Sequence, residues 1–398
     1  MMTYSNDFTY GGNPFRSFLM GGFECADHQN AFGERVDMIR LTGHDTFLKE
    51  DYDRIRPLNI RTVREGIRWS HVEKVPYQYD WTEVDQIILA AAEAGIQVIW
   101  DICHFGFPDD LTPLHPMFPR RFAHLCKAFA EHYRSLVPDE TLIITPINEV
   151  SFLSWLGGDA RGTSPYCTAQ GWEVKYRLMK AYIEGIEMMK EVDPGIRIMT
   201  TEPLIYVVSP DLSDDEQVLT AAAKHEEQFQ VLDMLSGKIC PELGGKPEYL
   251  DILGVNFYFN NQWTSTHHEL IPWGELPPHV LWKPLHTLIE EMFLRYGRPV
   301  VISETSHPGE HRPQWLDTIA EECLLMLKNG LPLYGCCIYP LIDRPDWDFP
   351  ALEWHHSGIW DILDPQTLER IPHEGSIRVL KKFSRAVSDL IVSPSYAD

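Results

Sequence analysis

Two glutamates, Glu149 in the segment PINEV and Glu304 in the segment VISET, have the residue type and setting best suited to catalysis. Each follows a short run of β-branched and other apolar residues, so each is expected at the end of a buried strand. A pair of carboxyl groups, one protonated and one ionised, is what cleavage of a glycosidic bond requires. The two residues are far apart in the sequence, so only the tertiary fold can bring them together.

The elements that would position this pair follow a repeating pattern of short apolar runs and helix-length segments. Helices are expected at 81–94, at 120–137, within 169–192 and at 376–391. For the first of these, Asp80 is the expected N-cap, and Gly95 suits the position after the last turn. The expected strands are SFLMGG, IRTVREG, IQVIWDI, LIITPI, IRIMTT, DILGVNF, PVVISE and GCCIYP.

This alternation predicts an α/β protein with a single (β/α)8 barrel domain over residues 1–398. Strands that are nearly continuous in apolar residues are buried on both faces, and alternation with helices indicates a parallel sheet. Eight such units fit a barrel better than a doubly wound sheet. No glycine-rich phosphate-binding segment follows the first strand, which also argues against a nucleotide-binding fold.

In a barrel of this kind, functional side chains gather at the carboxyl ends of the strands. The residues at the eight expected strand ends are unusually rich in carboxylates, amides and aromatic rings, a combination that suits carbohydrate chemistry. In chain order they are Glu24, Asp27, His28, Arg64, Glu65, Asp101, His104, Asn148, Glu149, Glu202, Asn256, Tyr258, Glu304, Tyr339, Asp343, Asp346 and Trp347.

Composition argues against several other classes of function. Acidic residues outnumber basic ones by 58 to 34, giving a formal net charge of -24, which disfavours nucleic-acid and membrane partners. No apolar run is long enough to span a bilayer, and residues 1–17 do not have the pattern of a secretory leader. The eight cysteines include no CxxC pair and are expected as reduced, buried thiols. We therefore expect a cytoplasmic protein.

From Phe18 to about Asp364 the chain resembles glycoside hydrolase family 1, within the wider clan of (β/α)8 retaining glycosidases. FLMGGFECADHQ is similar to the family's FLWGxATSAYQ, VREGIRWS to YRFSISWS, and DICHFGFP to TLxHWDLP. PINEV resembles TxNEP, LGVNFYF resembles IGxNYY, VISET resembles ITENG, and YPLIDRPDW resembles WSLLDNFEW. The matches occur in the family's order, and each falls at an expected strand end.

The resemblance implies a retaining exo-β-glycosidase without metal or cofactor, in which Glu304 is the nucleophile and Glu149 the acid/base. It implies that Arg64 and Tyr258 hold Glu304 ionised and oriented, with Asn256 in a supporting role beside the nucleophile. Further roles follow in the same way: Asn148 would bond the 2-hydroxyl of the sugar, and the expected contacts to the terminal sugar are His28, Glu24, His104, Tyr339, Asp346 and Trp347.

The expected sugar contacts are also where the chain departs from the family. His28 stands where the family has a glutamine, Tyr339 replaces a tryptophan, and Asp346 replaces a glutamate; the segment that begins at Glu24 differs as well. These changes predict a preferred sugar other than glucose. Because Pro340 follows Tyr339, a cis peptide costs only about 0.5–1 kcal/mol there, and we expect one.

Other interpretations remain open. An endo-acting β-glycanase of the same clan, a non-catalytic sugar-binding barrel and a metal-dependent barrel hydrolase are the alternatives, although Asp346 and Trp347 favour a pocket for a terminal sugar. Glu202 is the main rival carboxylate, expected in substrate contact or structural pairing. The loops 154–170 and 260–282 carry aromatic residues that either pack the loops or stack on the acceptor; these are Trp155, Tyr166, Trp263, Trp273 and Trp282. The paired histidines, expected in loops and not as metal ligands, are His267, His268, His355 and His356.

Overall fold

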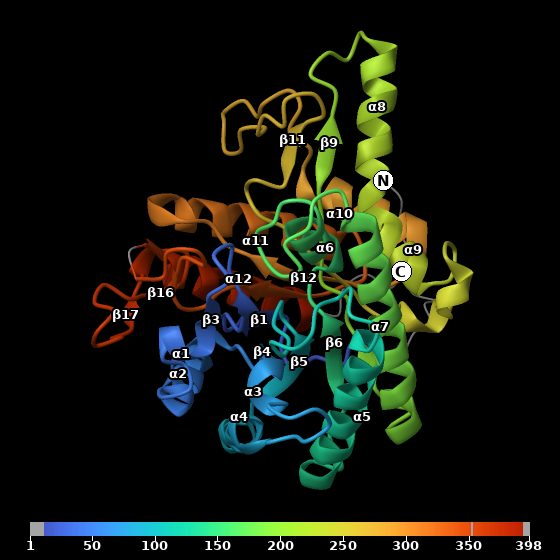
Figure 1. Cartoon of the computed structure of the whole chain (residues 1–398). Coiled ribbons are helices and arrows are strands. Elements are labelled where there is room, and N and C mark those ends of the chain that lie inside the picture. The colour runs from blue at the N-terminus through green and yellow to red at the C-terminus, as the bar shows by residue number, and fades with distance from the viewer. Residues whose placement is uncertain (1–11, 352, 393–398) are drawn as a thin grey trace.

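The computed structural model describes residues 12–351 and 353–392. Residues 1–11, on which part of the expectation about a leader rested, lie outside this range, as do residues 352 and 393–398. The assignment of the whole chain to one domain therefore stays a prediction. Within the described residues the predicted α/β barrel is present (Figure 1).

Parallel pairing joins the described barrel strands in chain order and closes the sheet on itself. The fifth strand is interrupted: its first part, β7, pairs with β6, its second part, β8, pairs with β10, and Met199 between them pairs with Ile252. The last strand returns to the first through β13 and β1. The strands are β1 (Leu19–Gly22), β4 (Thr62–Gly66), β5 (Gln97–Cys103), β6 (Ile143–Ile147), β7 (Arg197–Ile198) with β8 (Glu202–Pro203), β10 (Leu253–Asn256), β12 (Val300–Thr305) and β13 (Leu333–Ile338). All of these strands except β8 lie in or overlap a predicted apolar run, and β8 directly follows the run IRIMTT.

Helices surround this sheet (Figure 1). Long ones follow the strands: α4 (Thr82–Ala94), α5 (Phe118–Leu136), α7 (Gly171–Val192), α10 (Leu285–Tyr296), α11 (Arg312–Lys328) and α12 (Glu374–Val392). The expected helices are thus confirmed to within a few residues. Gly95 ends α4 in the left-handed conformation, with φ 69°, as expected. The N-cap prediction was wrong by one residue: Trp81 occupies that position, and Asp80 instead accepts bonds from the amide and hydroxyl of Thr82.

Further helices and strands lie in the connections between the barrel strands. Beyond the carboxyl ends of the strands lie α6 (Val150–Gly158), α8 (Asp215–Glu226) and the parallel pair β9 (Tyr206–Val208) and β11 (Gln262–Thr264). Of these, α8, β9 and β11 are at the top of Figure 1. The remaining helices and strands are α1 (Met38–Thr42), α2 (Leu48–Ile55), α3 (Trp69–Val72), α9 (Gln230–Leu235), β2 (Asp27–Gln29), β3 (Arg35–Asp37), β14 (Arg344–Pro345), β15 (Trp354–His355), β16 (Trp360–Asp361) and β17 (Ile371–Pro372).

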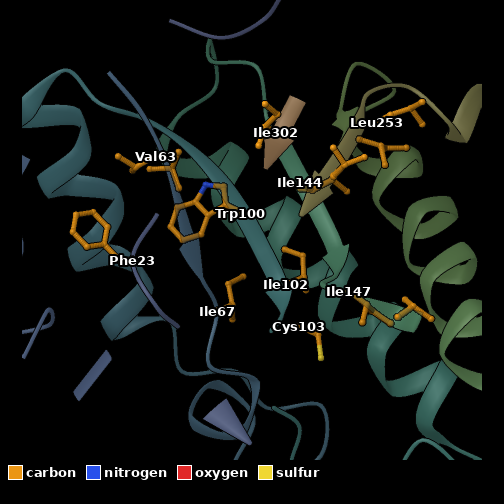
Figure 2. Packing of buried hydrophobic residues seen from close by; sticks show 14 of the residues in the cluster. Phe23, Val63, Ile67, Trp100, Ile102, Cys103, Ile144, Ile147, Leu253 and Ile302 are labelled. Carbon is orange, nitrogen blue, oxygen red and sulfur yellow. The ribbon is translucent and has the colours of Figure 1, made fainter. Parts of the chain in front are cut away.

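The core has two parts because side chains alternate along each strand. On β5, Ile99 points into the barrel and packs with Met20. Trp100 and Ile102 point to the other side and belong to the outer cluster, part of which is shown in Figure 2. The inner apolar layer also includes Ile143, Met199, Ile252, Val301, Cys337 and Tyr339. One alternation beyond Ile99, Asp101 is again an inward residue, so the polar site lies directly above this apolar layer.

Two further expectations from composition concern helices and thiols. Within residues 12–351 and 353–392, no helix has the length and apolar content needed to cross a bilayer. All eight cysteines are free thiols, and six of them are buried.

Candidate active site

Glu304, at the end of β12, is held by a hydrogen-bond donor on each carboxylate oxygen. Arg64 Nη1 donates to Oε1 at 2.8 Å, and the Tyr258 hydroxyl donates to Oε2 at 2.8 Å. The side chain of Glu304 is almost completely buried. A guanidinium and a hydroxyl are partners suited to a carboxylate, and they fix its orientation.

Glu149 sits directly before α6, with its backbone in the left-handed region at φ 44°. Its Oε1 accepts a bond from Asn256 Nδ2 at 2.9 Å. Desolvation by the surrounding protein, reinforced by repulsion from Glu304, raises the pKa of Glu149 to about 8, although Asn256 opposes the shift. Its side chain still keeps some solvent contact. The site therefore holds a carboxylic acid that is protonated at neutral pH beside a second carboxyl group.

Arg64 joins the second, third, fourth and seventh strands. Besides Glu304, its Nη2 donates to Asp101 Oδ2 at 2.6 Å and to Asn148 Oδ1 at 3.0 Å. Burial disfavours the charge on Arg64, but Asp101 and Glu304 outweigh this effect and raise its pKa well above the usual value. The bond to Asn148 Oδ1 turns the amide nitrogen of Asn148 toward His104 Nε2, at 3.3 Å.

Asn256 links the two glutamates through Ser303. Ser303 Oγ donates to Asn256 Oδ1 at 2.6 Å, which leaves Asn256 Nδ2 to donate to Glu149. Ser303 directly precedes Glu304, and its carbonyl accepts from Arg64 Nη1 at 3.0 Å. The fold thus brings together all six residues expected at the centre of the site. Ser303 was missed, although its place in VISET was a usable signal.

The residues expected to contact the terminal sugar form a wall with two sides. One side consists of Tyr339, His104 and Glu24. The Tyr339 hydroxyl donates to Glu24 Oε1 at 3.4 Å and lies 3.5 Å from His104 Nδ1. The Tyr339 and His104 rings are stacked with centroids 5.7 Å apart, and the Tyr339–Pro340 peptide is cis, as expected. On the other side, Glu24 Oε2 lies 3.3 Å from Arg344 Nε. Arg344 was not singled out from the sequence, where its place in the segment DRPDW was the available signal.

His28 and Trp347 form the other side of this wall. Their ring centroids lie 4.6 Å apart, and Phe105 packs against Trp347 at 5.4 Å. Burial lowers the pKa of His28 to about 3, so its ring is neutral. His28 Nδ1 and Trp347 Nε1 are buried polar atoms without a hydrogen-bond partner among the described residues.

Asp346 and Asp343 are engaged in holding the segment after β13. Asp346 Oδ1 accepts from the amides of Asp348 and Phe349, both at 2.8 Å, and its Oδ2 lies 2.8 Å from His355 Nε2. Asp343, which is fully buried, accepts from the amides of Gly358 and Ile362 and pairs with His356. His355 lies in β15 and not in a loop as expected. His355 and His356 are both carboxylate partners, and a sugar contact by Asp346 stays a prediction.

Two other strand-end carboxylates point away from the glutamate pair. Glu65 faces outward, where it accepts from Tyr52 at 2.7 Å and lies 3.1 Å from His44 Nε2. Asp27 accepts from the Ser70 hydroxyl at 2.6 Å. Glu202, in contrast, lies close to Glu149 and contributes to its raised pKa.

The aromatic residues of the loops divide into two groups. Tyr166, Trp263, Trp273 and Trp282 pack within or between loops, for example through the Trp273 Nε1 bond to His307 Nε2 at 3.1 Å. Trp155 on α6 is 53% exposed and contacts Phe152, which was not singled out from the sequence. Phe152 in turn packs against Phe105 and Trp347, so this group joins the site to the surface of α6.

Among the residues that the structure describes, two clusters have the residue types of metal ligands, and an arginine is bonded to a member of each. Ligand atoms of Cys25, Asp101 and His104 lie within 4.8 Å of one another, with Arg64 bonded to Asp101. In the second cluster, which includes Asp343 and His356, Arg312 pairs with the third member, Asp361. A bound divalent cation would be repelled by these guanidinium groups.

Comparison with solved structures shows that the chain shares its (β/α)8 fold with several β-glycosidases. The chain is similar to a β-glucosidase from Thermotoga maritima in complex with glucoimidazole: the TM-score is 0.72, the identity is 14%, and the match covers 96% of this chain and 99% of that one. A β-glycosidase from Pyrococcus horikoshii matches with TM-score 0.72 and 16% identity over 95% of both chains. The β-glycosidase BGL167 matches with TM-score 0.70 and 19% identity, over 97% of this chain and 99% of that one. Neither a protein-family model nor a curated protein sequence matches the chain.

Proposed function

We propose that the chain is a retaining exo-β-glycosidase of the family 1 type. The observation that carries the proposal is the pairing of Glu149, whose pKa is raised to about 8, with Glu304, which Arg64 and Tyr258 hold by one donor on each oxygen. Glycoside cleavage needs one carboxyl group that donates a proton and a second that attacks the sugar, and this pair supports those two roles. The motif resemblance and the fold shared with β-glycosidases support the same reaction.

In the first step, Glu304 attacks the anomeric carbon of the terminal sugar while the bond to the leaving oxygen breaks. Glu149 gives its proton to that oxygen, so the aglycone leaves as a neutral alcohol and Glu149 becomes a carboxylate. Arg64 and Tyr258 keep the attacking carboxylate oriented. The product is a sugar bound covalently to Glu304.

In the second step, the ionised Glu149 takes a proton from water as that water attacks the anomeric carbon. The bond to Glu304 breaks, the sugar leaves with its original configuration, and both carboxyl groups return to their starting states. The same raised pKa serves both steps, since a group that titrates near the working pH both gives and takes a proton readily.

Asn148 would bind the 2-hydroxyl of the sugar. Its Oδ1 is occupied by Arg64 at 3.0 Å, so its amide nitrogen, which also lies 3.3 Å from His104 Nε2, is the group that would donate to a substrate oxygen. A bond that shortens as the transition state forms accelerates the reaction more than one made equally in the bound substrate. Arg64 therefore serves both Glu304 and Asn148.

We propose that the preferred sugar differs from glucose because the wall around it differs from the family pattern. Glu24 and Arg344 form an ion pair at 3.3 Å, and Tyr339 donates to the same carboxylate. A panel of aryl β-glycosides tests this, and the expected result is that the glucoside is not the best substrate. A clear preference for glucoside would contradict it.

The assignment of the two glutamates is tested with Glu304→Ala, Glu149→Ala and the control Glu73→Gln. Glu73 is also a buried glutamate, but its partners are Trp69, Tyr77 and Arg121. Mass spectrometry after incubation with an activated 2-deoxy-2-fluoro glycoside should show a sugar attached to Glu304 in the wild type and in the control.

The two alanine variants are expected to lose activity in different ways. Glu304→Ala should not be labelled, and added azide should restore turnover of an activated substrate by Glu149→Ala. Binding of sugars without any turnover would instead favour a sugar-binding barrel. Cleavage of polymers but not of aryl monosaccharides would favour an endo-acting enzyme, and loss of activity in EDTA would favour a metal-dependent one.

A further inference from the structure

The helix that follows Glu149 lacks the usual cap at its N-terminus. The residue at the N-cap of a helix normally turns its side chain back to accept a bond from one of the first free amides. Glu149 occupies this position for α6, but it makes no such bond, because its carboxyl is directed to Asn256. The first amides of α6 must therefore find another acceptor.

Glu202 supplies that acceptor from the neighbouring strand. Its Oε2 accepts from the backbone amide of Ser151 at 3.2 Å, the second residue of α6. The side chain is almost completely buried, since Glu202 is only 4% exposed. A carboxylate at a helix N-terminus also interacts favourably with the partial positive charge of the helix dipole.

The backbone of Glu149 needs this support. Its φ of 44° and ψ of 58° lie in the left-handed region, which residues with a Cβ rarely adopt and which persists only where the surroundings impose it. The amide of Glu149 donates to the carbonyl of Thr201 at 2.8 Å, and Thr201 directly precedes Glu202. The fifth strand therefore holds the chain at Glu149 itself and again two residues later.

We propose that Glu202 is a positioning residue, which caps α6 in place of Glu149 and so leaves the Glu149 carboxyl fixed and free for proton transfer. The proposal rests on the glycosidase function proposed above, and the motif resemblance assigns Glu202 no role. Glu202 does not need to touch the substrate for this purpose.

The charged groups around Glu149 and Glu202 affect the pKa of Glu149, which has a measurable consequence. Glu304 and Glu202 face Glu149 and raise its pKa, while His104 lowers it; Tyr258 is also within range. Glu202 itself faces Lys175 on α7 and the amides of α6, and burial raises its pKa to about 7. The charge on ionised Glu202 opposes the loss of the proton from Glu149.

Two substitutions separate the cap from the charge. Glu202→Gln keeps an oxygen that can accept from Ser151 but removes the charge, whereas Glu202→Ala removes both. The matched control is again Glu73→Gln, which replaces a buried glutamate whose partners lie outside the catalytic group. Circular dichroism and thermal unfolding confirm that each variant is folded before its kinetics are compared.

The variants are assayed for kcat/KM against pH with two aryl glycosides of the sugar that the wild type prefers, a phenyl and a 2,4-dinitrophenyl glycoside. For Glu202→Gln, the alkaline limb of the pH profile with the phenyl glycoside should shift to lower pH by about half a unit or more, because a like-charged neighbour of Glu149 has been removed. For Glu202→Ala, kcat/KM for the phenyl glycoside should fall roughly ten-fold or more, because the acid Glu149 is no longer held in position. The dinitrophenyl glycoside, whose leaving group needs no proton, should be much less affected.

The outcomes are distinguishable from failure of the proposed function. If the wild type cleaves neither glycoside, it is the glycosidase proposal that fails. If the wild type is active, equal losses on both substrates by Glu202→Ala, or an alkaline limb that is unmoved in Glu202→Gln, would overturn the role of Glu202. A shift of the same size in Glu73→Gln would also overturn it.

Discussion

Removal of the Asn256 side chain should raise the pKa of Glu149. Asn256 Nδ2 donates to Glu149 Oε1 at 2.9 Å, and a donor of this kind favours the ionised form of the acceptor. Asn256→Ala takes the donor away without adding a charge. The direction of the shift is therefore upward, from the wild-type value of about 8.

The size of the shift follows from the strength of the bond. A hydrogen bond to a charged group contributes about 1.5–3 kcal/mol, and one pKa unit corresponds to about 1.4 kcal/mol, so a complete loss would give about 1–2 units. Water that enters the space left by the amide would replace part of the bond. An observed shift of about one unit is therefore expected.

The assay is the pH dependence of kcat/KM for an aryl glycoside with a poor leaving group. The alkaline limb reports the group that must be protonated in the free enzyme, so it should move to higher pH in Asn256→Ala. Ser303→Ala provides a graded companion, because Ser303 Oγ holds the Asn256 amide by its oxygen at 2.6 Å. This variant should move the limb in the same direction by less.

Two results would contradict the predicted effect of Asn256 on the pKa of Glu149. An alkaline limb that stays in place in a folded Asn256→Ala variant would mean that the bond to Glu149 does not contribute to its ionisation. A limb that moves to lower pH would mean that the amide acts mainly on the protonated form.

Three further outcomes are expected. Tyr258→Phe removes the donor to Glu304 Oε2 and should lower kcat roughly ten- to hundred-fold in a folded protein, measured with an activated glycoside. Arg344→Ala should change the ratio of KM values between glycosides of different sugars more than the ratio between glycosides of one sugar with different leaving groups. The reason is that Arg344 contacts Glu24, one of the expected sugar contacts. Equal changes in the two series would contradict this. His44 is buried, and Glu65 and Asp51 outweigh the effect of burial to raise its pKa to about 9, above about 6.5 in the unfolded chain, so its stabilisation is complete below pH 6.5 and lost as the pH rises through 9. The advantage of the wild type over His44→Gln in urea unfolding should accordingly shrink by about 3 kcal/mol across that window, and a constant difference would contradict the assignment.

The barrel could be predicted because its signals are local. Each strand is a short apolar run, and the helices between them have a period that can be read in about fifteen residues. Residues in such runs are buried whatever their partners are. The places of Glu149 and Glu304 at strand ends follow directly from this, since a barrel brings all the carboxyl ends of its strands to one face.

The partners of the individual side chains could not be predicted in the same way. Asp346 and His355 were assigned from their types and from a resemblance, but they bind each other, and the pairing depends on how the segment after β13 turns back. Arg344 was missed because its partner Glu24 lies at the other end of the chain. A hydrogen bond requires a donor–acceptor distance of about 3 Å and a suitable angle, and sequence patterns do not specify the positions of atoms to that precision.

The apolar runs, the order of strands and helices, and the two glutamates at the ends of the fourth and seventh strands can all be read from the sequence. The surroundings of those glutamates depend on the folded structure. Burial beside Glu304 gives Glu149 its raised pKa, and Glu202 accepts the amide that Glu149 leaves unbonded. The physical reason is that burial and charge–charge interactions depend on distances between residues far apart in the chain, which exist only after the barrel has closed.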